Sequence, residues 1–155
     1  MRQILFWLVF SSLTIISCSS TKVTKPDIAA IQGVEGHVYQ VTGNRMPISD
    51  APPVIPKGIQ TTIYIYENTN IKDVARVGTS AFYQSIRTNL VKTIDTDSTG
   101  YFTAQLPVGT YSLFTKVNGL FYANQFDIDN NIFSVKVIKG EMTQVIFKMD
   151  AGAKY

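Results

Sequence analysis

Two short stretches of the chain gather the carboxylate and amide oxygens that a hard metal ion binds. Asp95 and Asp97 lie in the run Asp-Thr-Asp-Ser-Thr-Gly, and Asp127 and Asp129 lie in the run Asp-Ile-Asp-Asn-Asn. An EF-hand loop that opened at Asp95 would need a bidentate glutamate at its last position, where Leu106 stands. Because Asp and Asn also build turns, we expect turns at both stretches, with a looser calcium site as the alternative.

The chain has one histidine, His37, which limits the catalysis it can support. Zinc sites use several nitrogen, sulfur or oxygen ligands, and a serine nucleophile would have to use His37 as its base. No Gly-x-Ser-x-Gly motif is present. His37 and Glu35 alternate with Val34 and Val38, so we expect them on the outward face of a strand. The sequence therefore predicts no catalytic residue, no cofactor and no enzyme activity.

Two pairs of neighbouring aromatic residues are the candidates for ligand binding. Phe82-Tyr83 and Phe121-Tyr122 both lie in stretches that we expect to be loops. Tyrosine combines a stacking surface with a polar tip, so these rings would suit a glycan or a protein partner. The alternative is that the same rings pack in the core or against loops.

Residues 1–17 have the features of a secretory leader. Arg2 gives a positive start, and an apolar run extends from Ile4 to Ile16. This run is shorter than the roughly 20 residues that span a bilayer, so a single membrane helix is the less favoured alternative.

Ile15-Ile16-Ser17-Cys18 resembles the lipobox of bacterial lipoproteins, and Cys18 is the only cysteine. In that family the thiol receives a diacylglyceryl group, the leader is cut before the cysteine, and the new amine is acylated, for example with palmitate. The resemblance implies a lipid anchor at Cys18, because two or more acyl chains hold a protein on a bilayer stably. Secretion with a free thiol is the alternative, and an intramolecular disulfide is impossible.

The residues after the cysteine indicate where such an anchor would be placed. Ser19 stands where lipoproteins of the inner membrane carry aspartate, so the resemblance implies the outer membrane. No acidic cluster follows Cys18, which favours the periplasmic side over the cell surface. Residues 18–30 are polar and are predicted to form a tether between the membrane and the domain.

The charge distribution argues against nucleic-acid binding, and the composition argues against an intrinsically disordered chain. The formal net charge is +3, and loss of Arg2 with the leader would leave +2. The basic residues are scattered and form no stripe that interleaves with aromatic residues. Hydrophobic residues make up 45% of the chain and charged residues 16%, which is typical of a folded domain.

Residues 31–150 show the alternation of short β-strands and are predicted to form one domain. Prolines in residues 44–58 mark a loop, and Asn70 would cap a helical turn at 70–74 in the otherwise irregular stretch 67–88. The pattern predicts an all-β fold, a single Greek-key-type antiparallel β-sandwich of about seven strands. The expected strands are 34–41, 61–66, 90–94, 101–106, 109–117, 132–138 and 142–149.

Three pieces of the domain resemble a known family. They are residues 33–39 (GVEGHVY), 95–102 (DTDSTGYF) and 106–113 (LPVGTYSL). In this order they are similar to the carboxypeptidase regulatory-like domain, a transthyretin-like (prealbumin-like) β-sandwich, over most of residues 33–149. Gly100 would take the positive φ of a tight turn, and the hydroxyl of Tyr111 would find a partner near the turn before it. The transthyretin-like hydroxyisourate hydrolases use several histidines and an arginine, a set that one histidine does not reproduce.

Together these features predict a non-catalytic, lipid-anchored envelope β-sandwich that acts as an interaction or accessory module. Its expected partners are the membrane, through the lipid anchor, and an envelope protein or a glycan. The alternative is a carbohydrate-binding lipoprotein of a nutrient-uptake system.

Overall fold

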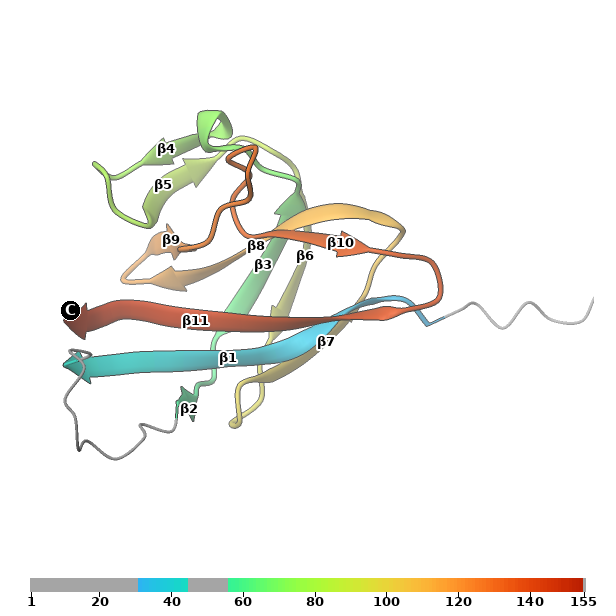
Figure 1. The fold of residues 1–155 in the computed structure, drawn as a ribbon, viewed down its shortest axis with the longest axis horizontal. Coiled ribbons are helices and arrows are strands. Elements are labelled where there is room, and N and C mark those ends of the chain that lie inside the picture. Colours follow the sequence, from blue (N-terminus) through green and yellow to red (C-terminus); the bar gives the residue numbers. More distant parts are fainter. Residues whose placement is uncertain (1–30, 45–55, 155) are drawn as a thin grey trace, which may run out of the picture.

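The computed structural model describes residues 31–44 and 56–154, which fold into two β-sheets (Figure 1). The predicted all-β sandwich is confirmed, with eleven strands in the described residues rather than about seven. Sheet A contains β1 (Gly33–Asn44), β2 (Lys57–Gly58), β7 (Tyr101–Gln105) and β11 (Met142–Lys154). Sheet B contains β3 (Thr62–Glu67), β4 (Val74–Arg76), β5 (Phe82–Ile86), β6 (Leu90–Asp95), β8 (Gly109–Val117), β9 (Leu120–Tyr122) and β10 (Ser134–Val137).

The first and last strands of the described fold lie side by side in sheet A. β1 pairs with β11 in parallel, and on its other side with β7 and β2 in antiparallel orientation. The expectation of an antiparallel sandwich is therefore wrong for this one pair. A parallel pair needs a long crossover connection, and here the whole intervening domain supplies it.

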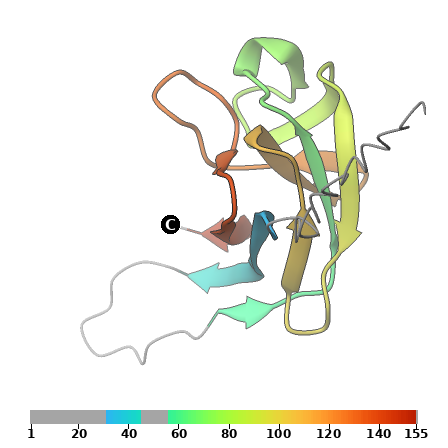
Figure 2. The same ribbon diagram turned by 90° about the vertical axis from the view of Figure 1, so that its right-hand side faces the viewer.

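The strands of sheet B follow the order β4-β5-β9-β8-β3-β6. Strand β10 pairs with the first part of β8, residues 109–112, and β9 pairs with its last part, residues 115–117. Strand β6 and the next strand, β7, belong to different sheets, so the turn between them carries the chain across the sandwich (Figure 2). Gly100 in this turn has a φ of 83°, as the sequence predicted. A β-carbon there would also lie 2.3 Å from the backbone oxygen of Val38.

The core between the sheets comes from alternate residues of the central strands. Val34 and Val38 face inward from sheet A, and Ile63, Ile65 and Leu113 face inward from sheet B; all five are 0% exposed. Between β10 and β11, the rings of Phe133 and Phe147 stack with centroids 4.5 Å apart. The domain needs no disulfide because this continuous apolar layer stabilises it.

Residues 67–88, which the sequence left undefined, add β4 and β5 to sheet B and contribute to a second apolar cluster on its outer face. Asn70 caps the short 3₁₀ helix η1 (Ile71–Asp73) by accepting a hydrogen bond from the Lys72 N–H, and β4 and β5 follow. Phe114 lies in this cluster, because it follows the inward Leu113 on β8 and therefore points to the outer face. The Phe114 ring is 0% exposed and lies 5.7 Å from the Tyr66 ring and 5.8 Å from the Tyr83 ring.

Candidate functional site

The four aromatic residues predicted from the sequence come together where β5 pairs with β9. Phe82 lies opposite Tyr122, and Tyr83 lies opposite Phe121. The expectation that these pairs lie in loops is wrong, because both are in strands whose backbones pair. Since opposite residues of a pair share a face, Phe82 and Tyr122 lie on one face and Tyr83 and Phe121 on the other.

Tyr83 and Tyr122 are core residues in this arrangement. Tyr83 is 0% exposed and Tyr122 is 1% exposed. The Tyr83 hydroxyl donates to the carbonyl of Ala123 at 3.2 Å, and burial raises the pKa of this phenol. The Tyr122 hydroxyl donates to the carboxylate of Asp150. Neither ring is open to a ligand, so the predicted aromatic surface reduces to Phe82 and Phe121, which are half-buried.

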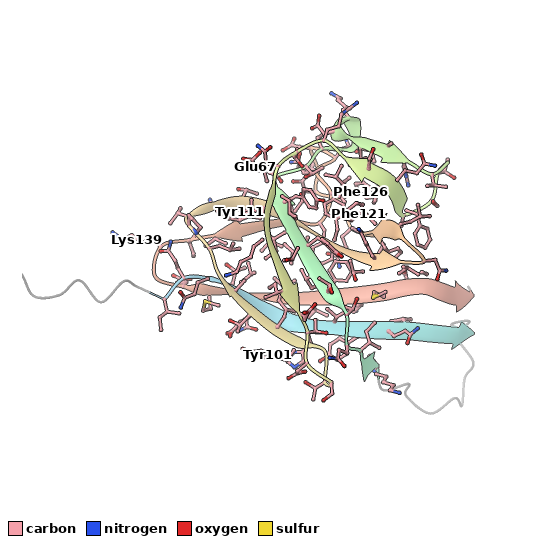
Figure 3. All side chains as sticks on the ribbon, turned by 180° about the vertical axis from the view of Figure 1, so that it is seen from behind. Glu67, Tyr101, Tyr111, Phe121, Phe126 and Lys139 are labelled. Carbon is pink, nitrogen blue, oxygen red and sulfur yellow. The ribbon has the colours of Figure 1, made fainter. Side chains whose placement is uncertain are left out.

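Phe121 is itself covered by a lysine. The Lys116 ammonium lies 4.6 Å from the centroid of the Phe121 ring and 4.9 Å from that of Tyr64. The two rings meet edge to face, with centroids 5.5 Å apart. This cation–π contact occupies the ring faces that a ligand would need, so we assign Phe121, labelled in Figure 3, to packing.

Phe82 lies at a hollow between the far ends of the two sheets, which we call the end cleft. Its volume is about 270 Å³, and it is lined by Gln40, Phe82, Val117, Asn118, Met149 and Ala151. The Phe82 ring packs on the Tyr122 ring with centroids 5.1 Å apart. A half-buried ring beside amide side chains gives the cleft both a stacking surface and hydrogen-bonding groups.

An irregularity in β11 places a carboxylate beside this cleft. The register of β1 against β11 shifts after Gln40: Gln40 pairs with Met149, and Thr42 pairs with Gly152, so β11 contains one extra residue at this point. Such a bulge changes the direction of a side chain. Here the Asp150 carboxylate accepts hydrogen bonds from the Tyr122 hydroxyl and from the Asn124 amide, the latter at 2.8 Å.

A second candidate site lies on the outer face of sheet A, where His37, Tyr39 and Tyr101 form what we call the ring face. The His37 ring lies 5.7 Å from the Tyr39 ring and 5.2 Å from the Tyr101 ring. All three side chains are half-buried, which leaves part of each ring exposed. His37 faces outward as predicted, but sequence reasoning missed the two tyrosines. The period of β1 places Tyr39 beside His37, whereas only the long-range pairing with β7 adds Tyr101.

Glu35 holds the ring face in place. Its carboxylate accepts a hydrogen bond from the Tyr101 hydroxyl at 2.9 Å and another from the Gln144 amide. The hydrogen bond to this carboxylate raises the pKa of Tyr101, because it stabilises the neutral phenol. Tyr101, labelled in Figure 3, is therefore a neutral, oriented ring at physiological pH.

Of the acidic candidates, Asp97 and Asp127 accept the hydrogen bonds of turns, and Asp95 ends β6. One carboxylate oxygen of Asp97 accepts from the Thr99 N–H, the Thr99 hydroxyl and the Tyr101 N–H. Asp127 accepts in the same way from the backbone of Asp129 and from Asn131. Asp95 accepts from the Thr62 hydroxyl at 2.6 Å. Within residues 31–44 and 56–154, no three His, Cys, Asp or Glu side chains gather into a metal-binding group.

These turns predict how stability depends on pH. Hydrogen bonds, first that from the Thr99 side chain, hold the pKa of Asp97 below its ordinary value. The ionised carboxylate therefore contributes stability that is complete above the unfolded-state pKa and is lost as pH falls through the folded-state pKa. We expect Asp97→Asn, which keeps an acceptor without the charge, to flatten the acid side of the stability profile measured by urea unfolding.

The control for that experiment is Glu141→Gln, which removes one carboxylate from a different turn. An acid-side profile that is the same for Asp97→Asn, Glu141→Gln and the parent chain would contradict the assignment.

The lipidation candidate Cys18 lies outside the described residues. In the described part of the chain, no helix has the length and apolarity to cross a bilayer. Comparison with protein-family models, curated proteins and solved structures gives no match, so the lipoprotein and carboxypeptidase regulatory-like resemblances stay predictions.

Proposed function

We propose that the chain is a non-catalytic, lipid-anchored module of the bacterial outer membrane that binds another envelope protein through the ring face. The observation that carries this proposal is the half-buried cluster of His37, Tyr39 and Tyr101 on the outer face of sheet A. Large rings with polar tips are concentrated at protein interfaces, where they bury much area with little loss of conformational entropy. The surrounding strands and Glu35 hold these rings in place before binding.

The proposed anchor and the described fold are compatible in direction. The chain enters the described fold next to the turn between β10 and β11, because Gly140 N–H donates to the Gln32 side chain at 3.2 Å. Lys139 of that turn and the carboxyl ends of β1 and β11 lie at opposite ends of the molecule (Figures 1 and 3). A tether at residues 18–30 would therefore hold the sandwich by one end and leave the ring face and the end cleft accessible.

One experiment with two arms tests the proposal. In the first arm, the parent chain should incorporate a fatty-acid probe and remain in the membrane fraction, while Cys18→Ala should lose both properties. In the second arm, the anchored chain is purified from solubilised membranes as the parent, as Tyr39→Ala/Tyr101→Ala, and as the control Leu90→Ala/Val108→Ala. The control residues are exposed by 49% and 58%; Leu90 lies on β6 of sheet B and Val108 in the loop between β7 and β8.

We expect an envelope protein to co-purify with the parent and with the control, and to be reduced at least about tenfold with the tyrosine variant. Circular dichroism checks that the variants are folded. Equal recovery from all three chains would refute the ring face as the binding surface, and an unlabelled parent chain would refute the anchor.

The end cleft favours carbohydrate binding as a second candidate function. Sugars stack on aromatic rings and use side-chain amides for their hydroxyls, and the cleft combines the Phe82 ring with Gln40 and Asn118. On a glycan array the parent chain would then bind a defined saccharide, and Phe82→Ala would lose this signal while Tyr39→Ala/Tyr101→Ala kept it. An array without signal would exclude this candidate and leave the first.

A further inference from the structure

Another hollow of the described structure opens between the edges of the two sheets, and we call it the edge groove. Its volume is about 310 Å³. Val135 and Lys136 of β10, with Phe133 just before that strand, line one side, and Thr143, Val145 and Ile146 of β11 line the other. The two sides are β10 and the first half of β11, which are consecutive in the chain but belong to different sheets.

Both walls of the edge groove are sheet edges. β10 pairs with β8 and β11 pairs with β1, and neither has a second partner strand within residues 31–44 and 56–154. A free edge presents a row of backbone N–H and C=O groups that another strand can bind. The Thr143 hydroxyl donates to the Lys136 carbonyl at 2.7 Å and joins the walls at the end nearest the β10–β11 turn.

The floor of the groove is apolar and contains a strained residue. Phe133 and Val145 are 4% and 6% exposed. Phe133 has a φ of 39°, a conformation that a bulky side chain rarely adopts. Its N–H donates to the Gln125 carbonyl at 2.9 Å, and its ring stacks on Phe147. Backbone strain that the surroundings hold in place is concentrated at ligand-binding sites.

The exposed side chains at the rim of the groove indicate what kind of ligand would fit it. Lys136 is the one ionisable residue among the described residues that line it, and its side chain is exposed. On the other wall, Ile146 is 58% exposed. Many edge strands carry a charged residue at such a position, and that charge prevents pairing with another strand. The groove thus offers backbone hydrogen bonds, an apolar floor and one positive charge.

We propose that the edge groove binds an extended polypeptide segment that alternates apolar and polar residues and carries a carboxylate opposite Lys136. The segment adds to the edge of β11 as a further strand of sheet A. Its backbone pairs with that edge, its apolar side chains lie on Phe133 and Val145, and its carboxylate contacts the lysine. The three rings of the ring face do not line this groove, although Gln144, which donates to Glu35, does. Binding in the groove does not depend on the proposed function.

The test uses the purified full chain and a fluorescent peptide of alternating valine and threonine with one central glutamate. We expect saturable binding by anisotropy, and we expect Lys136→Glu to weaken it about threefold to tenfold. A peptide with lysine in place of the glutamate should show the reverse preference and bind the Lys136→Glu variant more tightly. Ile146→Lys, which places a charge on the edge, should weaken both peptides.

The matched control is Lys92→Glu, which reverses an exposed lysine on β6 and should leave binding unchanged. Tyr39→Ala/Tyr101→Ala should also leave it unchanged, so failure of the ring face and failure of the groove are distinguishable. Absent binding, or equal effects of Lys136→Glu and Lys92→Glu, would overturn the proposal. A dimer of the full chain that Ile146→Lys dissociates would also overturn it, because the occupant would then be a second copy.

Discussion

Replacing Gly36 with alanine is expected to destabilise the sandwich strongly. Gly36 lies in the middle of the parallel pair of β1 and β11, opposite Val145. A β-carbon at this position would lie 1.8 Å from the backbone oxygen of Val145 and 2.7 Å from its carbonyl carbon. Because these are backbone atoms, they move away only if β11 separates from β1.

The expected loss in the free energy of unfolding is at least about 4 kcal/mol, which is a large part of the roughly 5–15 kcal/mol that stabilises a typical domain. Urea unfolding followed by far-UV circular dichroism measures it, with the soluble yield as a second readout. The control is Gly119→Ala, where φ is 82° but no atom lies within 4 Å of the new β-carbon. There we expect a loss of only about 1 kcal/mol from backbone strain.

A Gly36→Ala variant within about 1 kcal/mol of the parent would show that β1 and β11 are not in close parallel contact. This pair joins the first and last strands of the described fold, so the result also tests how the domain is closed.

Phe114→Ala is expected to have the next largest effect, a loss of about 3–5 kcal/mol in the free energy of unfolding. The ring is 0% exposed and lies on the outer face of sheet B, in contact with Tyr83 of β5. Its neighbours Tyr66, Tyr83 and Phe121 all meet it edge to face, so truncation leaves a cavity that these rigid rings fill poorly. Thermal and urea unfolding at neutral pH measure the effect.

The matched control is Phe126→Ala, which removes the same ring from an exposed position (Figure 3). Phe126 is 41% exposed, so we expect its replacement to cost about 1 kcal/mol or less. Similar losses for Phe114→Ala and Phe126→Ala would show that Tyr83 of β5 does not pack against Phe114.

The parts of the fold that depend on local patterns were predicted from the sequence. Alternation placed Val34 and Val38 inside and His37 outside, because side chains of a strand point to opposite faces in turn. The predicted partner of Tyr111 near the preceding turn is confirmed, since its hydroxyl donates to the Pro107 carbonyl at 3.0 Å. Local turn chemistry also identified the positive φ of Gly100.

The parts that depend on pairing between distant strands were not predicted. Nothing in the local sequence of β1 or β11 indicates that they run in parallel, because both show the same alternation as an antiparallel strand. The same holds for Phe82 and Tyr122, which β5 and β9 bring together. Residues 67–88 form short strands whose sequence shows no clear alternation. In β5, for example, Tyr83 alone is buried, against Phe114, and the two residues that follow it are exposed.

The candidate sites were predicted only in part for the same reason. From the sequence, aromatic residues were predicted to form the binding surface, but the residues chosen were pairs that are adjacent in the chain. Adjacent residues in a strand face opposite ways, so such a pair cannot form one surface. The ring face instead combines residues at alternate positions of β1 with Tyr101 from β7, across the sheet.

The most direct test of the proposed binding function is photo-crosslinking from single positions of the full chain in intact cells. A photoreactive phenylalanine analogue replaces Tyr39 on the ring face or, as the control, Leu90 on β6, which is 49% exposed. We predict a discrete crosslinked product with an envelope protein from position 39 and none from position 90. No product from position 39, or the same products from both positions, would contradict the proposal that the ring face binds a partner.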